Sequence, residues 1–308
     1  MRILITGASG FIGRALTRAL SGAGFDVIAA ARDVTAVPLA PHVRAVALPD
    51  LALPVDWRPL LADVDAVVHL AGIAHVQDGP SNDNYDRVNR LATKELALAC
   101  SLNSNIRRLV FVSSIRAQAG PAADHSLTET DTPQPTDAYG RSKLAAEAFV
   151  RGYGVPFTIL RPVVVYGPEV RANIAQLRRA ASLPFPLPFG AFGNRRSLLA
   201  LENLISALRF VLETPSTAGE TYIVSDPSAL SFAELIATLR KASGRSPGLL
   251  PIPPGWIGAA LRTAGKGDVW ERIGASLVAD ARKLREAGWQ PPTDTPHGLS
   301  ELVRPPRP

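Results

Sequence analysis

The stretch Thr6-Gly-Ala-Ser-Gly-Phe-Ile-Gly13 follows the strand-like segment Arg2–Thr6 and opens a helical pattern over Phe11–Leu20. Its three glycines let backbone amides approach a pyrophosphate at the amino end of that helix. A glycine string alone is a weak signal, because any tight turn can contain one. Its place between a strand and a helix at the start of the chain predicts a dinucleotide-binding turn, formed by Gly7, Ser9, Gly10, Phe11, Ile12 and Gly13.

Outward from this turn, the first half of the chain alternates strand and helix patterns, which is typical of a parallel sheet with helices on both faces. We therefore expect an α/β fold with a doubly wound Rossmann sheet. Strands are predicted at Arg2–Thr6, Asp26–Ala31, Val43–Leu48, Asp65–Leu70, Arg108–Ser114 and Phe157–Arg161. Helices are predicted at Phe11–Leu20, Tyr85–Cys100 and Tyr139–Gly152.

Beyond Tyr166 proline becomes frequent and the alternation becomes irregular, which indicates a smaller carboxy-terminal α/β substrate domain. We expect residues 1–165 to bind the dinucleotide and residues 166–308 to bind the substrate, with some later segments packing back on the first domain. The stretch Ser231-Phe-Ala-Glu234 predicts a capping box at a helix start. Pro253 and Pro254 predict the start of another short helix.

Composition indicates an enzyme-sized chain, since 308 residues, 46% of them apolar, can bury a large core. The sequence has neither a long apolar run nor a signal-peptide start, so we expect a cytoplasmic protein with no membrane contact. The formal charge of +6 fits an anionic substrate such as a nucleotide. Because the basic residues are dispersed, we expect no nucleic-acid partner.

Cysteine and histidine usage argues against a metal site. Cys100 is the only cysteine, which excludes an internal disulfide and a cysteine-rich metal site. His69, His75 and His297 lack the spacing of a helical ligand pair, and we expect no metal. His69 is expected to pack at the end of its strand.

Near the middle of the chain, Tyr139-Gly-Arg-Ser-Lys143 places a phenol and an ammonium on one helix face. The ammonium of Lys143 is expected to lower the pKa of Tyr139, so that the phenol can give or take a proton. This pattern alone is common on solvated helices. Together with the glycine-rich turn, it predicts redox chemistry on an alcohol or ketone.

The end of the second strand bears on which dinucleotide binds. A carboxylate there would accept hydrogen bonds from the adenosine ribose, and Ala29-Ala30-Ala31-Arg32 offers an arginine instead. The Arg32 guanidinium can pair with a 2′-phosphate, so NADP(H) is favoured over NAD(H). Asp50, followed by Leu51, is placed to meet the adenine.

The chain resembles the extended short-chain dehydrogenase/reductase family, in particular its nucleotide-sugar epimerase, dehydratase and reductase branch. The resemblance spans nearly the whole length. Its motifs occur in order as the glycine-rich turn, Asp65-Ala-Val-Val-His-Leu-Ala-Gly72, Asn89, Phe111-Val-Ser-Ser114, Tyr139-Gly-Arg-Ser-Lys143 and Leu160-Arg-Pro-Val-Val-Val-Tyr-Gly-Pro168.

The resemblance implies that Tyr139 is the acid/base, that Lys143 binds the nicotinamide ribose, and that Ser114 bonds the reacting oxygen. Ser113 is the neighbouring candidate for that last role. The cofactor cleft would be lined by Leu70, Ala71, Gly72, Asn89, Pro162 and Val165. Family members pair two helices in a dimer, so we expect a homodimer through the alanine-rich helices Tyr85–Cys100 and Tyr139–Gly152, with Ala92, Ala97, Ala99, Ala145, Ala146 and Ala148 allowing close approach.

Departures from the family pattern narrow the chemistry. Dehydratases carry an Asp-Glu pair after the catalytic hydroxyl residue, where this chain has Ile115 and Arg116. Because isoleucine has no proton to give, dehydration is not expected. Val164 stands where many relatives carry a substrate-binding asparagine, and Asn173 is a replacement candidate.

The resemblance also extends to Asn194-Arg-Arg-Ser-Leu-Leu-Ala-Leu-Glu-Asn203, and it implies that Arg196 reaches the substrate diphosphate, with Arg272 as a second candidate. Phe189, in Leu187-Pro-Phe-Gly190, is a candidate wall for a uracil or thymine ring, with a structural loop as the alternative. His75 is a further substrate candidate. We expect a UDP-sugar in preference to a dTDP-sugar.

Four functions follow from this pattern. The first is reduction of a 4-keto nucleotide sugar of the UDP-N-acetyl-6-deoxyhexose type, for surface polysaccharide synthesis, and Arg32 favours it over the second, nucleotide-sugar 4-epimerisation. The third is reduction of a small-molecule ketone. The fourth is a non-catalytic dinucleotide-binding role, which the presence of Ser114, Tyr139 and Lys143 argues against.

Overall fold

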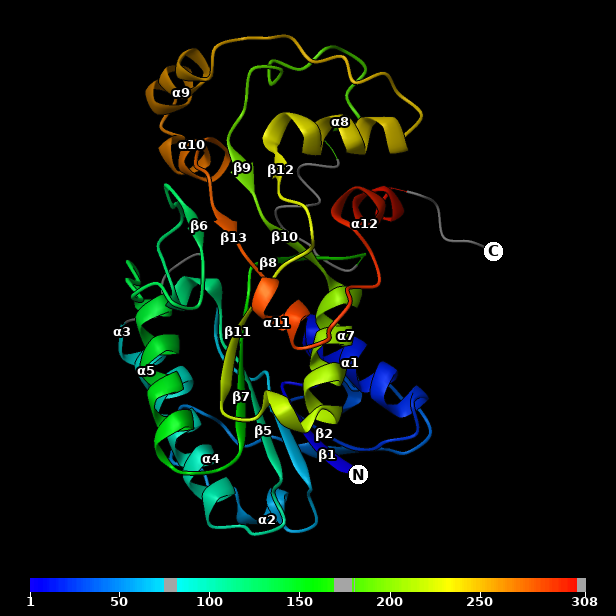
Figure 1. Cartoon of the computed structure of the whole chain (residues 1–308), viewed down its shortest axis with the longest axis vertical. Coiled ribbons are helices and arrows are strands. Elements are labelled where there is room, and N and C mark those ends of the chain that lie inside the picture. Colours follow the sequence, from blue (N-terminus) through cyan, green and yellow to red (C-terminus); the bar gives the residue numbers. More distant parts are fainter. Residues whose placement is uncertain (75–81, 169–178, 180, 304–308) are drawn as a thin grey trace.

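The computed structural model describes residues 1–74, 82–168, 179 and 181–303 (Figure 1). Its centre is a seven-stranded sheet in the order β11-β7-β5-β4-β1-β2-β3, in which every neighbouring pair is parallel. The strands are β1 (Arg2–Thr6), β2 (Asp26–Ala31), β3 (Val43–Ala47), β4 (Ala66–His69), β5 (Arg108–Val112), β7 (Phe157–Pro162) and β11 (Glu220–Val224). The doubly wound α/β prediction is confirmed.

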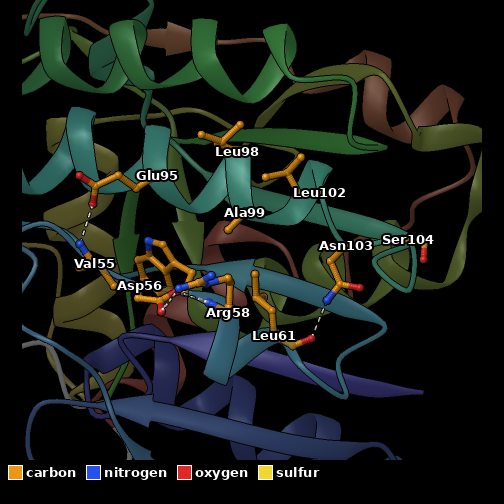
Figure 2. Close-up of a pocket in the computed structure, with 11 residues that line it drawn as sticks. Val55, Asp56, Arg58, Leu61, Glu95, Leu98, Ala99, Leu102, Asn103 and Ser104 are labelled. Atoms are coloured by element: carbon orange, nitrogen blue, oxygen red, sulfur yellow. Dashed lines mark hydrogen bonds and ion pairs between the residues drawn. The ribbon is translucent and has the colours of Figure 1, made fainter.

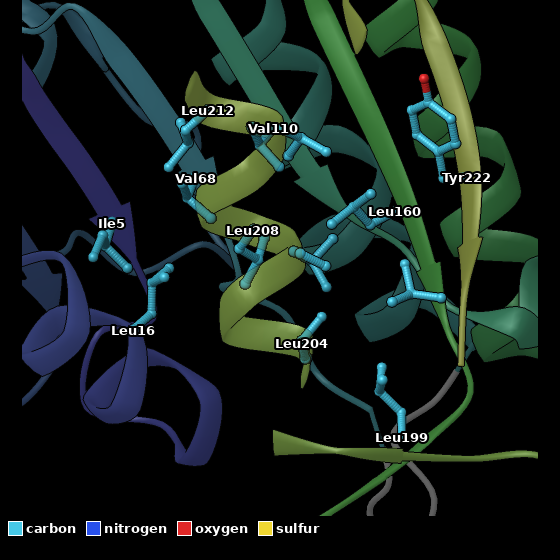
Figure 3. Packing of buried hydrophobic residues seen from close by; sticks show 14 of the residues in the cluster. Ile5, Leu16, Val68, Val110, Leu160, Leu199, Leu204, Leu208, Leu212 and Tyr222 are labelled. Carbon is cyan, nitrogen blue, oxygen red and sulfur yellow. The ribbon is translucent and has the colours of Figure 1, made fainter. Parts of the chain in front are cut away.

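Alternate residues of the strands point to opposite faces of the sheet and form two separate cores. Ile3 and Ile5 pack on one face beneath α1 (Phe11–Gly22), α7 (Leu201–Glu213) and α11 (Arg282–Glu286). Figure 3 shows leucines of α7 lying on this face. Leu4 packs on the other face beneath α2 (Arg58–Leu61), α4 (Ala92–Ser101) and α5 (Ala138–Gly152).

The helix predicted over Tyr85–Cys100 is continuous but changes its winding. It consists of α3 (Asn82–Tyr85), the π-helical turn η2 (Asp86–Leu91) and α4. Turns of this kind occur frequently at functional sites, because they displace side chains from the regular helical register. Here the turn carries Asn89.

The later part of the chain adds short strand pairs and helices above the carboxyl ends of the sheet (Figure 1). The strand pairs are β8 (Val164–Tyr166) with β10 (Leu198–Ala200), β9 (Arg195–Arg196) with β12 (Leu230–Ser231), and β6 (Ser126–Leu127) with β13 (Val278–Ala279). The helices are α8 (Phe232–Ala242), α9 (Pro254–Thr263), α10 (Gly267–Gly274) and α12 (Thr295–Glu301), and short 3-10 turns are η1 (Val34–Ala36), η3 (Ile115–Ala117) and η4 (Pro215–Thr217). The capping box of α8 is present, because Ser231 Oγ accepts from Glu234 N at 3.1 Å and Glu234 Oε2 accepts from Ser231 N at 2.7 Å.

Two elements of the later part return to the central sheet. β11 pairs with β7 as its seventh strand, and α7 covers the face that α1 also covers. We expected some later segments to pack back on the first domain, but neither of these two elements was predicted individually, since they follow the irregular proline-rich segment. The division at residues 165 and 166 therefore remains a proposal about function, because the later half also contributes to the first core.

None of the helices in the described part of the chain is both long and apolar enough to cross a membrane.

Candidate active site

The sheet reverses its strand order between β1 and β4, and ligands of doubly wound folds bind at such a switch point. The turn after β1 lies directly against the segment after β4. A Cβ placed on Gly7 would come within 2.9 Å of the backbone nitrogen of Ala71. The glycine-rich turn and the segment that holds the predicted cleft residues Leu70, Ala71 and Gly72 are thus in close contact at the switch point.

The turn residues leave backbone amides available for an anion. Gly7 has a φ of 73°, which a residue with a side chain rarely adopts, and a Cβ on Gly13 would collide with the Gly7 carbonyl oxygen. Gly10 is the N-cap residue of helix α1, which has no side-chain cap and no acidic residue in its first turn. Because the first amides of a helix have no partner within it, they fit the pyrophosphate of a dinucleotide.

A hydrogen-bond chain through His69 links the ends of β1 and β4 to the helix that carries Asn89 and Thr93. Thr6 Oγ1 accepts from Ala71 N at 3.2 Å and lies 2.7 Å from His69 Nδ1. On the other side, His69 Nε2 lies 3.0 Å from Thr93 Oγ1, which donates to Asn89 O at 2.7 Å. Burial is the main cause, and the charge of Lys143 the second, that lowers the pKa of His69 to about 3, so the imidazole is neutral. As expected, His69 packs at the end of its strand.

Asn89 is buried, and its side chain holds the segment that follows Gly72. Its Oδ1 accepts from Ile73 N at 2.9 Å, and its Nδ2 donates to Ile73 O at 2.9 Å and to Ser142 Oγ at 3.1 Å. Both amide hydrogens and the carbonyl are therefore occupied in the described structure. We interpret Asn89 as shaping the cofactor cleft through Gly72 and Ile73.

Ser114, Tyr139 and Lys143 gather where β5 ends and α5 begins. The hydroxyls of Ser114 and Tyr139 are hydrogen-bonded to each other. Lys143 is buried, with its Nζ 4.5 Å from the centre of the Phe111 ring. A Cβ on Gly72 would lie 4.0 Å from that Nζ, so the ammonium faces the predicted cofactor cleft.

The pKa of Tyr139 is raised in this structure, and not lowered as the sequence suggested. Burial is the main cause, and the hydrogen bond from Ser114 and the charge of Arg116 oppose it. Burial also lowers the pKa of Lys143 to about 8, although the charge of Glu147 opposes that shift. The pKa of Tyr139 is thus set by burial and by groups other than Lys143.

The two adjacent serines are separated by the structure. Ser113 is buried and its Oγ donates to Glu147 Oε1 at 2.6 Å, whereas Ser114 reaches Tyr139. This geometry favours Ser114 over Ser113 as the partner of the reacting oxygen. Tyr85, which the sequence did not single out, lies with its ring 6.1 Å from that of Tyr139.

The part of the site predicted to bind adenosine, near the end of β2, is exposed to solvent. Arg32 is exposed, and Asp50 is exposed with its Oδ1 accepting from Ala52 N at 3.0 Å, while Leu51 is buried. Asp33, a carboxylate directly after Arg32 that the sequence reasoning passed over, caps η1 by accepting from Thr35 N at 2.9 Å. The acidic residue nearest the strand end is therefore engaged with its own turn.

Cleft residues from the later strands are in place. Pro162 ends β7 and is buried, and Val165 lies partly buried in β8. Arg196 lies in β9, with its Nε donating to Ala275 O at 3.0 Å. Its pKa is lowered, first by burial and then by the charge of Arg116.

Other predicted substrate residues are placed less favourably or not at all. Phe189 packs edge-on against Phe192 and Phe232, with ring centres 5.4 and 5.2 Å apart, which supports the alternative of a structural loop. His75 and Asn173 lie outside the described residues. The side chain of Arg272, within α10, also lies outside the described part.

The alanines expected at a dimer interface do not all face outward. Ala92, Ala97 and Ala146 are fully buried against the sheet within one chain, so they cannot contact a partner. The outer faces instead expose Leu98, at 41%, and Leu102, at 79%.

A surface pocket that contains none of the candidate catalytic residues lies between α2 and the end of α4 (Figure 2). Leu98 of α4 and Leu102, directly after that helix, line it together with Leu61 of α2. It contains none of the predicted site residues. Among the residues described, no group of three side chains is arranged to hold a metal ion.

Comparison with known proteins agrees with this geometry. The sequence model of the family described as NAD dependent epimerase/dehydratase matches residues 3–225. The chain is 31% identical to a UDP-glucose 4-epimerase of Vibrio cholerae, over 98% of this chain and 94% of that protein. It is 29% identical to a dTDP-glucose 4,6-dehydratase of Mycolicibacterium smegmatis, over 98% and 92% of the two chains. The solved structure of MoeE5 in complex with UDP-glucuronic acid and NAD matches with a TM-score of 0.77 and 26% identity, over 98% of both chains.

Proposed function

Because the chain belongs to the NAD-dependent epimerase/dehydratase family of extended short-chain dehydrogenase/reductase enzymes, we propose that it transfers hydride at carbon 4 of a nucleotide-linked sugar. The observation that supports this most directly is the pairing of Ser114 with Tyr139 beside the uncapped glycine-rich turn. When bound, the nicotinamide would supply or accept the hydride. Residues 1–165 would hold the dinucleotide and residues 166–308 most of the sugar nucleotide.

The chain's own residues would handle the proton. Tyr139 is protonated at neutral pH, since a tyrosine phenol has an ordinary pKa of about 10 and burial raises the pKa of this one further, so it can donate to the oxygen on carbon 4 when a ketone is reduced. In the reverse direction Tyr139 takes that proton back. Ser114 would hold the same oxygen, and the ammonium of Lys143 would hold the nicotinamide ribose.

We favour 4-epimerisation of a UDP-sugar as the net reaction. The full-length similarity to a UDP-glucose 4-epimerase and to a protein solved with a UDP-sugar and NAD supports it. An epimerase oxidises carbon 4 and returns the hydride to the other face, so its cofactor is not consumed. Dehydration is not proposed, because Ile115 offers no proton.

Reduction of a 4-keto nucleotide sugar by NADPH is the second candidate, and Arg32 is the observation that favours it. The residue is exposed at the end of β2, and the nearby carboxylate of Asp33 is engaged with Thr35. An exposed guanidinium in this place suits a 2′-phosphate better than a ribose hydroxyl pair. A reductase would release oxidised cofactor at each turnover.

One experiment separates these reactions. The purified protein is incubated with UDP-glucose, UDP-N-acetylglucosamine and a UDP-4-keto-6-deoxyhexose, each with and without NADPH, and products are identified by NMR. Conversion of a UDP-sugar to its C4 epimer without added NADPH supports the epimerase. Consumption of one NADPH per ketone supports the reductase.

Binding of UDP tests the wider proposal. Absence of both reactions and of UDP binding would contradict a nucleotide-sugar substrate and favour reduction of a small-molecule ketone.

A further inference from the structure

Helix α9 exposes an apolar face at the end of the molecule farthest from the central sheet (Figure 1). Gly258 of this helix is buried, whereas Trp256, Ala259 and Ala260 are exposed. Their spacing of three and four residues places these three side chains on one face of the helix. Trp256 is 72% exposed. Because single exposed apolar residues are common, the segments around α9 decide whether this face belongs to a larger patch.

Two loops at the same end of the molecule expose further large apolar side chains. Leu183 and Phe185 are exposed in the first loop, and Leu250 is exposed in the second, which leads into α9. Backbone hydrogen bonds join the loops, since Leu187 N donates to Gly248 O at 2.9 Å and Leu250 N donates to Leu187 O at 2.8 Å. The two loops therefore form one surface.

Residues next to the exposed ones anchor this surface from inside. Leu249 and Ile257, which precede Leu250 and follow Trp256, pack against one core cluster. The buried Arg240 ties the loops together, because its Nη1 donates to the Leu183 carbonyl at 3.1 Å and its Nε to the Ser246 carbonyl at 3.0 Å. The fold itself thus turns the other side chains towards solvent.

The charges carried by these segments are all positive. The sequence has no acidic residue between Glu234 and Asp268, and none from Arg179 to Leu201. The exposed cations between Glu234 and Asp268 are Lys241, Arg245, Arg262 and Lys266. Tryptophan and aliphatic side chains with lysine and arginine around them are typical of segments that lie on a membrane surface. Tryptophan occupies the headgroup level there, and the cations meet anionic lipids.

We propose that the α9 face, formed by residues 183–186 and 245–266, docks this protein on the surface of a lipid bilayer that carries anionic headgroups. Trp256 enters the headgroup region, and Arg245 and Lys266 lie against lipid phosphates. From the sequence we expected no membrane contact, because the chain has no long apolar run, but contact with the surface of a bilayer requires none. The inference does not depend on the proposed function.

Vesicle co-sedimentation of the full chain tests this docking with two lipid compositions, phosphatidylcholine alone and phosphatidylcholine mixed with phosphatidylglycerol. We expect tighter binding to the anionic vesicles, and added salt should weaken it by screening the charges. Tryptophan emission provides a second readout. Trp57 and Trp289 are buried and Trp270 is partly buried, so a shift to shorter wavelength on binding reports on Trp256.

Variants of the α9 face separate its apolar and charged contributions. Trp256→Ala should weaken binding to the anionic vesicles about tenfold or more, because it removes most of the apolar ring area, and should abolish the emission shift. Arg245→Gln and Lys266→Gln should each weaken binding about fivefold. Arg262 is left unchanged, because its guanidinium carbon lies 5.8 Å from the centre of the Trp270 ring and its loss also affects packing.

Leu39→Ala and Arg44→Gln are the matched controls, because both residues are exposed and lie in or next to β3 of the central sheet. Neither control should change vesicle binding. Thermal unfolding is compared for all variants. If Trp256→Ala unfolds at a lower temperature than the wild type, the two cation variants, which lie outside α9, decide the outcome.

Four results would overturn the proposal. They are no binding of the wild type to either vesicle, equal binding to both lipid compositions, unchanged binding of Trp256→Ala, and losses in the controls equal to those in the α9 face. Light scattering without vesicles tests a second copy as the occupant. Self-association that Trp256→Ala abolishes, in a wild type that binds no vesicle, would assign the α9 face to an interface between copies. None of these results bears on the activity of the candidate active site.

Discussion

Glu147 and Arg161 form a buried ion pair close to Lys143 of the candidate catalytic residues. Arg161 Nη2 donates to Glu147 Oε2 at 2.6 Å and Arg161 Nε donates to Oε1 at 2.9 Å. Glu147 lies one helical turn after Lys143, and Arg161 precedes Pro162 of the cofactor cleft. With Ser113 also bonded to Oε1, the pair ties α5, β5 and β7 together where the active site forms.

We expect Glu147→Gln to destabilise the protein by about 3–5 kcal/mol, because removing one partner leaves the other charge buried and unpaired. Although burial raises it, the hydrogen bonds and charge of Arg161 lower the pKa of Glu147 overall, so the carboxylate is ionised near neutral pH. Denaturant unfolding measures the effect. The control is Glu213→Gln, whose exposed pair with Arg209 should contribute less than about 1 kcal/mol. Equal losses in both variants would contradict a structural role for the buried pair.

Tyr139→Phe is expected to lower kcat by about a hundred- to ten-thousandfold while leaving dinucleotide affinity within a few fold, because it removes the proton and little contact area. Tyr153→Phe, at the far end of α5, should have no effect. Steady-state kinetics and cofactor titration measure both quantities. Retention of most of the rate would show that another group transfers the proton.

The adjacent serines provide a second comparison at the same site. Ser114→Ala should lower kcat, whereas Ser113→Ala should chiefly lower stability, since its hydroxyl bonds Glu147. The reverse result would reassign the two residues.

Cofactor binding is expected to weaken as pH rises through about 8. Burial lowers the pKa of Lys143 to that value, and only the ammonium form can donate all its hydrogens to the ribose. Below the pKa the ammonium is present and affinity is constant. Above it the free protein must first take up a proton, so the dissociation constant increases with pH. Lys143→Met should bind more weakly at neutral pH and lose this dependence; an unaltered pH profile would exclude the role.

Arg32 sets the expected cofactor preference. If its guanidinium pairs with the 2′-phosphate, NADPH binds more tightly than NADH, and Arg32→Ala removes about 1.5–3 kcal/mol, or roughly ten- to a hundredfold, of that difference. Arg44→Ala, an exposed arginine on β3, is the control. Fluorescence titration of both cofactors measures the ratio. Equal affinities in the wild type would remove the argument for the reductase.

A homodimer through α4 and α5 remains our prediction, now with a revised contact surface. Leu98 is 41% exposed on the outer face of α4, and Lys94 of the same helix lies over the Phe149 ring of α5. Leu98→Glu should give a monomer in light scattering at micromolar concentration, whereas Leu39→Glu, at a fully exposed position between β2 and β3, should leave the dimer intact. A monomeric wild type would contradict the prediction.

The sequence determined the first half of the fold and the central part of the site, because their signals are local. The glycine-rich turn needs only a strand before it and a helix after it, and Tyr139 and Lys143 share a helix face through their spacing alone. Short strand-like segments alternating with helical patterns located six of the seven central strands within about two residues. β11 was missed because it reaches the sheet from beyond the irregular segment, where no local pattern indicates its partner β7.

Only the tertiary structure decided the electrostatics and the choice between neighbours. Burial, which depends on every packed element, raised the pKa of Tyr139 against the expectation drawn from Lys143. The sequence alone does not distinguish the roles of Ser113 and Ser114. The folded structure does, because Ser113 is hydrogen-bonded to Glu147 of α5. Contacts of this kind cannot be predicted from one sequence, because they depend on which segments, far apart along the chain, pack against each other and exclude water.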